Sequence, residues 1–223
     1  MNELAYKLHV DTVIETIERA RLKVSGHHIV KIVAVSKYSD TDAIKALYHI
    51  GQRAFGENKV QDLKAKSTAL EALPLEWHFI GNLQKNKINQ LLQIDPTLFQ
   101  GLDSLELAHA LQQRLSDQES SLEALLQINS AAEASKHGVS CDEAVDVYHR
   151  ISQECPNITL RGVMSIGAHS NDRRTVQRSF EATHRIYETL RADICSMGMS
   201  NDYELAIECG SNMVRLGSVL FPK

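Results

Sequence analysis

IVAVSK, residues 32–37, is a short aliphatic run that ends on a lysine. The four residues at 32–35 show no polar alternation, which is typical of a strand buried on both faces of a sheet. Lys37 then stands at the carboxyl end of that strand, at the rim of a core. An amine in this position could form a Schiff base with an aldehyde. A lysine whose aliphatic side chain only packs against the rim of the core would show the same pattern.

Strands and helices alternate along the rest of the chain. Seven further apolar runs are predicted strands, at 53–55, 77–80, 97–102, 122–128, 158–163, 193–196 and 213–216. Helices are predicted in the gaps, at 43–50, 59–73, 85–93, 104–115, 141–153, 175–191 and 201–207. Eight strands separated by helices predict an α/β fold, a single (β/α)8 TIM-type barrel. Residues 2–24 form an extra amphipathic helix that could cover the gap after the eighth strand. An open doubly wound sheet is the alternative.

Composition narrows the classes of function. The 223 residues carry a formal net charge of −4. This charge disfavours binding to nucleic acid or to an anionic membrane through overall electrostatic attraction. No apolar run approaches the roughly 20 residues of a membrane span, and the charged N-terminal helix is unlike a secretory signal. We therefore expect one cytoplasmic domain over 1–223. The four widely spaced cysteines are expected to be free thiols rather than a metal site.

Two segments near the end of the chain could bind a phosphate. Ser196–Ser200 (SMGMS) follows the seventh strand, and Arg215–Ser218 (RLGS) follows the eighth. The loops after these two strands are the usual phosphate site of such barrels. Their glycines let the backbone approach an anion closely, and Ser200 and Ser218 add hydroxyl donors. Alternatively, both turns need glycine and serine for their shape alone.

Several other side chains fall at strand ends, where some should face the same barrel mouth. They are Asn58, His78, Asn82, Asn129, Met164 and, after the fifth strand, Lys136. His78 lies inside a predicted strand, where a packed core histidine is as consistent as a ligand contact. No HExxH or related metal spacing occurs among the histidines.

Eight motifs occur in one order along the chain. They are AVSK at 34–37, FGENKVQ at 55–61, WHFIGNLQKNK at 77–87, QIN at 127–129, ExxKxG at 133–138, RGVM at 161–164, SMGMSND at 196–202 and VRLGSVLF at 214–221. In that order they resemble the pyridoxal phosphate homeostasis proteins, the YggS/PROSC-like family, which is related to the N-terminal barrel domain of alanine racemase. The resemblance covers almost the whole chain, and the motifs at 77–87 and 196–202 are highly specific.

The resemblance implies a monomeric barrel with pyridoxal 5'-phosphate held as a Schiff base on Lys37. It also implies a phosphate near Ser200, Gly217 and Ser218, and Arg215 facing the pyridine nitrogen. The full set of expected cofactor-binding residues is Lys37, Asn58, His78, Met164, Ser200, Arg215, Gly217 and Ser218.

The function that the resemblance implies is carriage or buffering of this vitamin B6 cofactor, with apo-enzymes as candidate recipients. A racemase of the related fold needs a second acid–base group from an added C-terminal domain of a partner subunit. We expect none here, because the chain ends just after the eighth strand. An arginine at the ring nitrogen would also weaken the cofactor as an electron sink. The alternatives are a racemase or lyase acting on a small amino acid, a Schiff-base aldolase without cofactor, and a pure interaction module.

Overall fold

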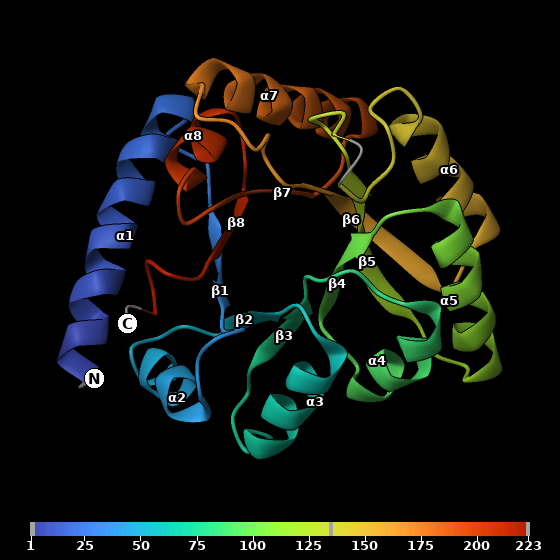
Figure 1. Cartoon of the computed structure of the whole chain (residues 1–223), viewed down its shortest axis with the longest axis horizontal. Coiled ribbons are helices and arrows are strands. Elements are labelled where there is room, and N and C mark those ends of the chain that lie inside the picture. Colours follow the sequence, from blue (N-terminus) through green and yellow to red (C-terminus); the bar gives the residue numbers. More distant parts are fainter. Residues whose placement is uncertain (1–2, 134–135, 222–223) are drawn as a thin grey trace.

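The computed structural model describes residues 3–133 and 136–221, and its eight strands form a closed parallel barrel (Figure 1). The strands are β1 (Lys31–Val35), β2 (Ala54–Glu57), β3 (Glu76–Phe79), β4 (Leu98–Leu102), β5 (Leu122–Ile128), β6 (Ile158–Ser165), β7 (Ile194–Met199) and β8 (Met213–Leu216). Each pairs with the next, and β8 pairs with β1, so that Ile32 lies beside Val214. This closure confirms the predicted (β/α)8 barrel and excludes the open sheet.

Helices cover the outside of the barrel (Figure 1). Between the strands lie α2 (Thr41–His49), α3 (Val60–Ala69), η1 (Lys85–Lys87) with α4 (Ile88–Ile94), α5 (Leu105–Asp117), α6 (Ala144–Glu154), α7 (Arg173–Leu190) and α8 (Tyr203–Glu208). The N-terminal helix α1 (Glu3–Val24) packs against α2 and α8, in the place predicted for it. Asn2, the predicted start of that helix, lies outside the described residues. None of the described helices is both long and apolar enough to cross a membrane.

Two strands run past their predicted ends at residues 55 and 196. β2 continues to Glu57, and β7 continues to Met199, so most of the predicted 196–200 loop is strand. Gly198 has a φ of +92°, and a Cβ on it would lie 2.6 Å from the Cβ of Ala206 in α8. This glycine therefore lets α8 pack closely on β7, because any side chain would collide with the helix.

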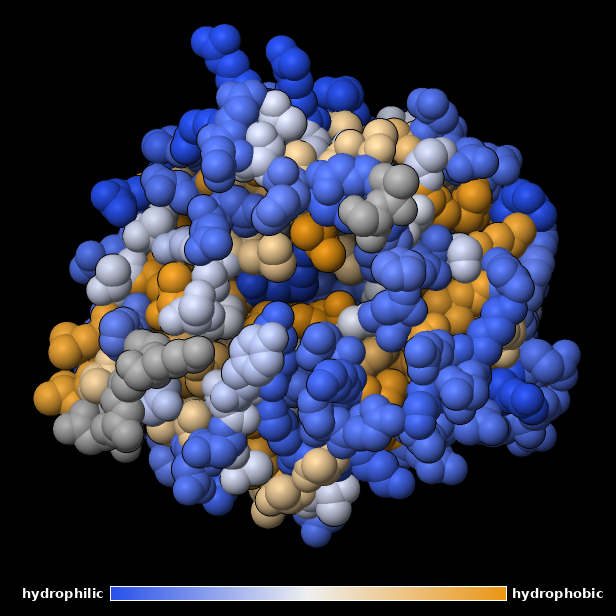
Figure 2. Space-filling view, in the orientation of Figure 1, coloured by the Kyte–Doolittle hydropathy of each residue, from blue (hydrophilic) through white to orange (hydrophobic). Residues whose placement is uncertain are grey.

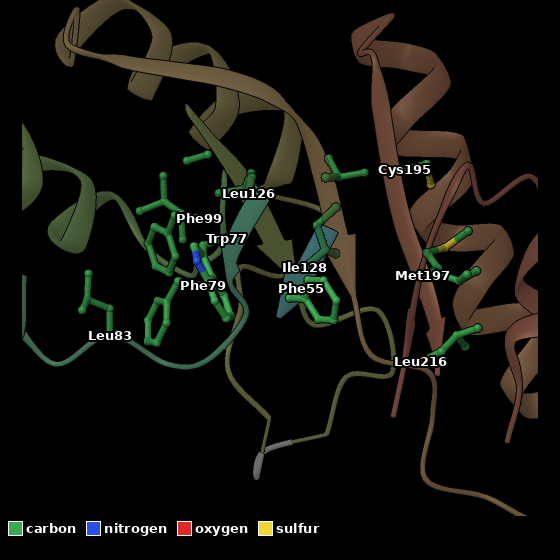
Figure 3. Packing of buried hydrophobic residues seen from close by; sticks show 14 of the residues in the cluster. Phe55, Trp77, Phe79, Leu83, Phe99, Leu126, Ile128, Cys195, Met197 and Leu216 are labelled. Atoms are coloured by element: carbon green, nitrogen blue, oxygen red, sulfur yellow. The ribbon is translucent and has the colours of Figure 1, made fainter. Parts of the chain in front are cut away.

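The core has two apolar layers because successive strand residues point to opposite faces. The outer layer lies between barrel and helices, and Figure 3 shows part of it, including Phe79 and Phe99, whose ring centroids are 5.7 Å apart. The inner layer fills the barrel and consists of Val33, Ala54, Leu98, Leu125, Met164 and Met213. The inner layer forms the floor under the carboxyl ends of the strands.

A glycine in β6 allows close approach to β7. Gly162 has a φ of +153°, and a Cβ there would lie 1.9 Å from the carbonyl oxygen of Ile194. The pairing with β5 also shifts beside it, since Ala124 pairs with Leu160 and Leu125 with Gly162. This places an extra residue in β6, a β-bulge of the kind that re-aims strand ends.

Gly162→Ala is expected to lower the free energy of unfolding by about 2–3 kcal/mol, because the new methyl group must push β7 away. This corresponds to a fall in melting temperature of roughly 4–12 °C for a chain of this size. Thermal unfolding followed by circular dichroism measures it. Gly26→Ala is the matched control, since a Cβ at Gly26 meets no described atom within 4 Å. Equal melting temperatures for the two variants would contradict the close approach.

Candidate functional site at the mouth of the barrel

A cavity of about 1520 Å³ opens at the carboxyl ends of the strands. Figure 2 shows the molecule hollowed near the centre of this face, with strongly hydrophilic residues deep in the hollow and hydrophobic ones beside them. Seven of the eight expected site residues line it, namely Lys37, Asn58, Met164, Ser200, Arg215, Gly217 and Ser218. The ends of β1, β2, β6, β7 and β8 thus converge on one space.

Lys37 lies in the turn between β1 and α2, and its side chain lines the cavity. The N–H of Ser36 donates to the carbonyl oxygen of Gly56 at 3.1 Å, which extends the pairing of β1 with β2 by one residue. On the other side, the Asp40 side chain caps α2 by accepting the N–H of Ala43. The Nζ of Lys37 lies 5.0 Å from the ring centroid of Tyr38. The backbone on both sides of the amine is therefore fixed.

A buried ion pair lies directly behind this turn. The Oε1 atom of Glu57 accepts hydrogen bonds from the Oγ of Ser36 and the Nζ of Lys66, both at 2.6 Å. The same Nζ donates to the carbonyl oxygen of Ser36 at 2.7 Å. The pair joins β2 and α3 to the residue before Lys37. Our sequence reasoning missed it, because the predicted strand at 53–55 ended before Glu57 and left this carboxylate in a turn.

Arg215 enters the barrel from β8 and is only 4% exposed. Its Nη1 donates to the carbonyl oxygen of Ser196 at 2.9 Å and to the Oγ of Ser196 at 2.6 Å. Its Nη2 donates to the carbonyl oxygen of Ser165 at 2.8 Å. Burial lowers the pKa of Arg215 to about 10, so the guanidinium stays charged at neutral pH. It gives the cavity a fixed positive charge.

The turns after β7 and β8 meet at the mouth. The N–H of Gly217 donates to the Oγ of Ser200 at 3.1 Å. The Oδ1 of Asp202 accepts the N–H of Met199 at 2.6 Å, and burial raises the pKa of this carboxyl. A Cβ on Gly217 would be in ordinary van der Waals contact with β1, 3.5 Å from the carbonyl oxygen of Val35. Together with Ser218, these donors fit a phosphate group.

His78 lies below the other expected residues, inside the barrel, and is 1% exposed. Its Nδ1 lies 2.9 Å from the Nε2 of Gln100, and it is not among the residues lining the cavity. Burial lowers the pKa of His78 to about 4, so the ring is neutral in the folded protein. Of the two readings left open by the sequence, this placement matches the packed core histidine.

The other residues at strand ends either line the cavity or shape a loop beside it. Asn82 and Lys136 line the cavity. Asn129 instead donates through Nδ2 to the carbonyl oxygens of Glu133 and Lys136, which shapes the loop after β5. Residues 134–135 of the motif at 133–138 lie outside the described part of the chain. Within that part, no group of three or more His, Cys, Asp or Glu side chains could hold a metal ion.

Lys66→Met is expected to lower the free energy of unfolding by about 3–5 kcal/mol, because it leaves the Glu57 carboxylate buried without its cation. Glu57→Gln combined with Lys66→Met should lose less, since it removes the unpaired charge. Urea unfolding measures both, with Lys64→Met on the exposed side of α3 as control. A Lys66→Met variant as stable as that control would show that the pair contributes nothing.

The low pKa of His78 makes stability depend on pH. The unfolded chain binds the extra proton between the ordinary value of 6.5 and the folded value of about 4, so stability falls as pH drops through this window. The full loss is about 3 kcal/mol. His78→Asn should lack this component, so its urea midpoint should change less between pH 7 and pH 4.5. If the urea midpoints of the two proteins changed equally with pH, the pH dependence would not come from His78.

Comparison with known proteins covers almost the whole chain. Residues 8–222 match the family described as alanine racemase, N-terminal domain. The pyridoxal phosphate homeostasis protein of Helicobacter pylori (strain J99) is 52% identical over 219 residues, which are 98% of this chain and 99% of that one.

Two solved structures are similar along nearly their full lengths. An unknown protein from Bifidobacterium adolescentis has a TM-score of 0.89 and 28% identity, over 99% of this chain and 97% of that one. PipY of Synechococcus elongatus, solved with PLP bound, has a TM-score of 0.78 and 30% identity, over 92% of this chain and 99% of that one. The order of motifs, the barrel and the 52% identity agree: the chain belongs to the pyridoxal phosphate homeostasis protein family, built on the alanine racemase N-terminal domain.

Proposed function

We propose that this protein holds pyridoxal 5'-phosphate covalently through Lys37 and acts as a carrier or buffer of the cofactor. The observation that carries the proposal is the shared cavity of Lys37, Arg215, Ser200, Gly217 and Ser218. These residues bring an amine, a cation and phosphate donors to one space. A relative that is 30% identical was solved with PLP bound, which supports the choice of ligand.

Each group on the cavity wall has a distinct part in binding. The Nζ of Lys37 condenses with the aldehyde carbon, forming one C=N bond and releasing one water. The hydroxyls of Ser200 and Ser218 bind the phosphate at the other end, beside Gly217, whose N–H holds the Oγ of Ser200. Asn58 lines the wall at the end of β2, and Met164 lines the wall on β6.

The position expected for Arg215 favours a protein that holds the cofactor over one that catalyses a reaction with it. When bound, pyridoxal phosphate supplies an aldehyde and a ring that withdraws electrons best when its nitrogen is protonated. The family resemblance implies that Arg215 faces that nitrogen. A guanidinium donates hydrogen bonds and accepts none, so it would leave the nitrogen without a proton. We therefore propose that the protein lacks robust catalysis of its own.

The location, the oligomeric state and the recipients of the cofactor are also part of the proposal. We propose a cytoplasmic monomer that uses residues 1–223 as one cofactor-binding domain and passes the cofactor to apo-enzymes. The opposed proposal is a racemase or lyase, and a racemase needs a second acid–base group opposite Lys37. Tyr6 lines the cavity, but burial raises the pKa of its hydroxyl, which makes it a poorer base at neutral pH.

The test is borohydride reduction of the purified protein mixed with pyridoxal phosphate, followed by peptide mass mapping. The expected product is a phosphopyridoxyl adduct on the peptide that contains Lys37, absent in Lys37→Ala and retained in the exposed control Lys64→Ala. An adduct confined to another lysine, such as Lys136, would contradict the proposal.

A second arm tests for catalysis in the same preparation. The loaded protein is incubated with alanine or serine in deuterated water, and exchange of the α-proton is followed by NMR. The proposal expects no exchange above that of free cofactor. Exchange that is fast and depends on Lys37 would favour the racemase or lyase instead.

A further inference from the structure

A chain of four polar side chains crosses the interior of the barrel beneath the cavity. It consists of His78 on β3, Gln100 on β4, Ser196 on β7 and Arg215 on β8. Their exposures are 1%, 0%, 0% and 4%. They lie in a barrel interior that otherwise contains apolar side chains such as Leu98 and Leu125. Polar groups are costly to bury unless they are hydrogen-bonded, so the arrangement of these bonds matters.

The direction of every hydrogen bond follows from Arg215. A guanidinium only donates, so the Oγ of Ser196 accepts from Nη1 at 2.6 Å. The single proton of Ser196 then goes to the Oε1 of Gln100 at 2.7 Å. This leaves the Nε2 of Gln100 to donate to the Nδ1 of His78 at 2.9 Å. His78 must therefore carry its proton on Nε2.

A further contact of Gln100 agrees with this direction. The second proton of the Gln100 amide points to the Sδ of Met213 at 3.4 Å, a contact that a reversed amide would lose. The Nε2 of His78 is buried and has no hydrogen-bond partner within the described residues. A second proton on the ring would oppose the Gln100 amide, and burial already lowers the pKa of His78 to about 4.

We propose that Gln100, Ser196 and His78 are positioning residues that fix Arg215 against the bound cofactor; this rests on the proposed function. Three acceptors, the carbonyl oxygens of Ser165 and Ser196 and the Oγ of Ser196, hold the guanidinium from below. Gln100 holds the hydroxyl proton of Ser196, which keeps a lone pair of the Oγ directed at Arg215. His78 in turn fixes the amide, and bonds in such a chain strengthen one another.

Substitutions within the chain separate this role from simple packing. Gln100→Leu replaces the amide by an apolar group of similar size and leaves the Ser196 hydroxyl and the Nδ1 of His78 without their partner, so it should also lower stability. Without the Gln100 amide the Ser196 hydroxyl can rotate, which weakens one of the three contacts that hold Arg215. Ser196→Ala removes the Oγ acceptor itself. Leu98→Val, on the same strand and in the inner apolar layer, is the matched control because it disturbs packing and no hydrogen bond.

The measurements are the dissociation constant for pyridoxal phosphate and the visible absorption spectrum of the bound cofactor. Gln100→Leu and Ser196→Ala should each raise the constant about tenfold, or about 1.4 kcal/mol, and shift the spectrum. Leu98→Val should lower the melting temperature and change neither. His78→Asn, which keeps an acceptor for Gln100, should retain the native spectrum, whereas His78→Leu should resemble Gln100→Leu.

A second readout needs no cofactor. Nitrogen-15 NMR of the protein alone should show a neutral His78 with its proton on Nε2, and the Nδ1 resonance should change in Gln100→Leu. A proton on Nδ1 would overturn the proposal. So would a Gln100→Leu protein with native affinity and spectrum, or a Leu98→Val protein with the same changes as Ser196→Ala. If the unaltered protein forms no adduct on Lys37, the proposed function fails, and the NMR result still decides the hydrogen-bond chain.

Discussion

The pairing of β8 with β1 is the constraint on which the rest of the structure depends. It sets Val33 beside Arg215 and Ala34 beside Leu216, although about 180 residues separate them in the chain. The same register brings the turn that contains Lys37 next to the turn that contains Gly217. An amine and the turn proposed to bind phosphate become neighbours because the sheet closes, and an open sheet would have left them at opposite edges.

Two groups of buried polar residues support the site from different directions. The Glu57–Lys66 pair lies outside the barrel wall and fixes the backbone just before Lys37. The chain from His78 to Arg215 lies inside the barrel and fixes a positive charge beneath the cavity. Both join strands to one another through side chains, so the rim of the barrel is held independently of the backbone pairing. This rigidity suits a site whose groups must be placed before the ligand arrives.

The alternation of apolar strands with helices was enough to predict the barrel, because parallel strands buried on both faces leave a plain signal in the sequence. The end of β7 was missed because Gly198 indicates a turn in the sequence, whereas the structure keeps it within the strand, against α8. The position of His78 depended on which face of β3 it occupied. Strand alternation places it opposite the outward Phe79, but says nothing about how deep it lies.

The buried contacts of the site were harder to predict than its rim. Lys37, Ser200 and Ser218 stand at strand ends, which the sequence marks by the change from apolar to polar residues. Gln100 and Ser196 are 96 residues apart and meet only across the closed barrel. The available signal was a glutamine inside the otherwise apolar strand Leu98–Leu102. Such a residue indicates a buried partner without identifying it.

The central claim is that one cavity positions Lys37, Arg215 and the two turns for a single ligand. A crystal structure of the protein grown with pyridoxal phosphate tests this most directly. We predict continuous electron density from the Nζ of Lys37 to the cofactor, Arg215 next to the ring nitrogen, and the phosphate on Ser200, Gly217 and Ser218. Density for the cofactor on another lysine, or with the phosphate away from these turns, would contradict the account.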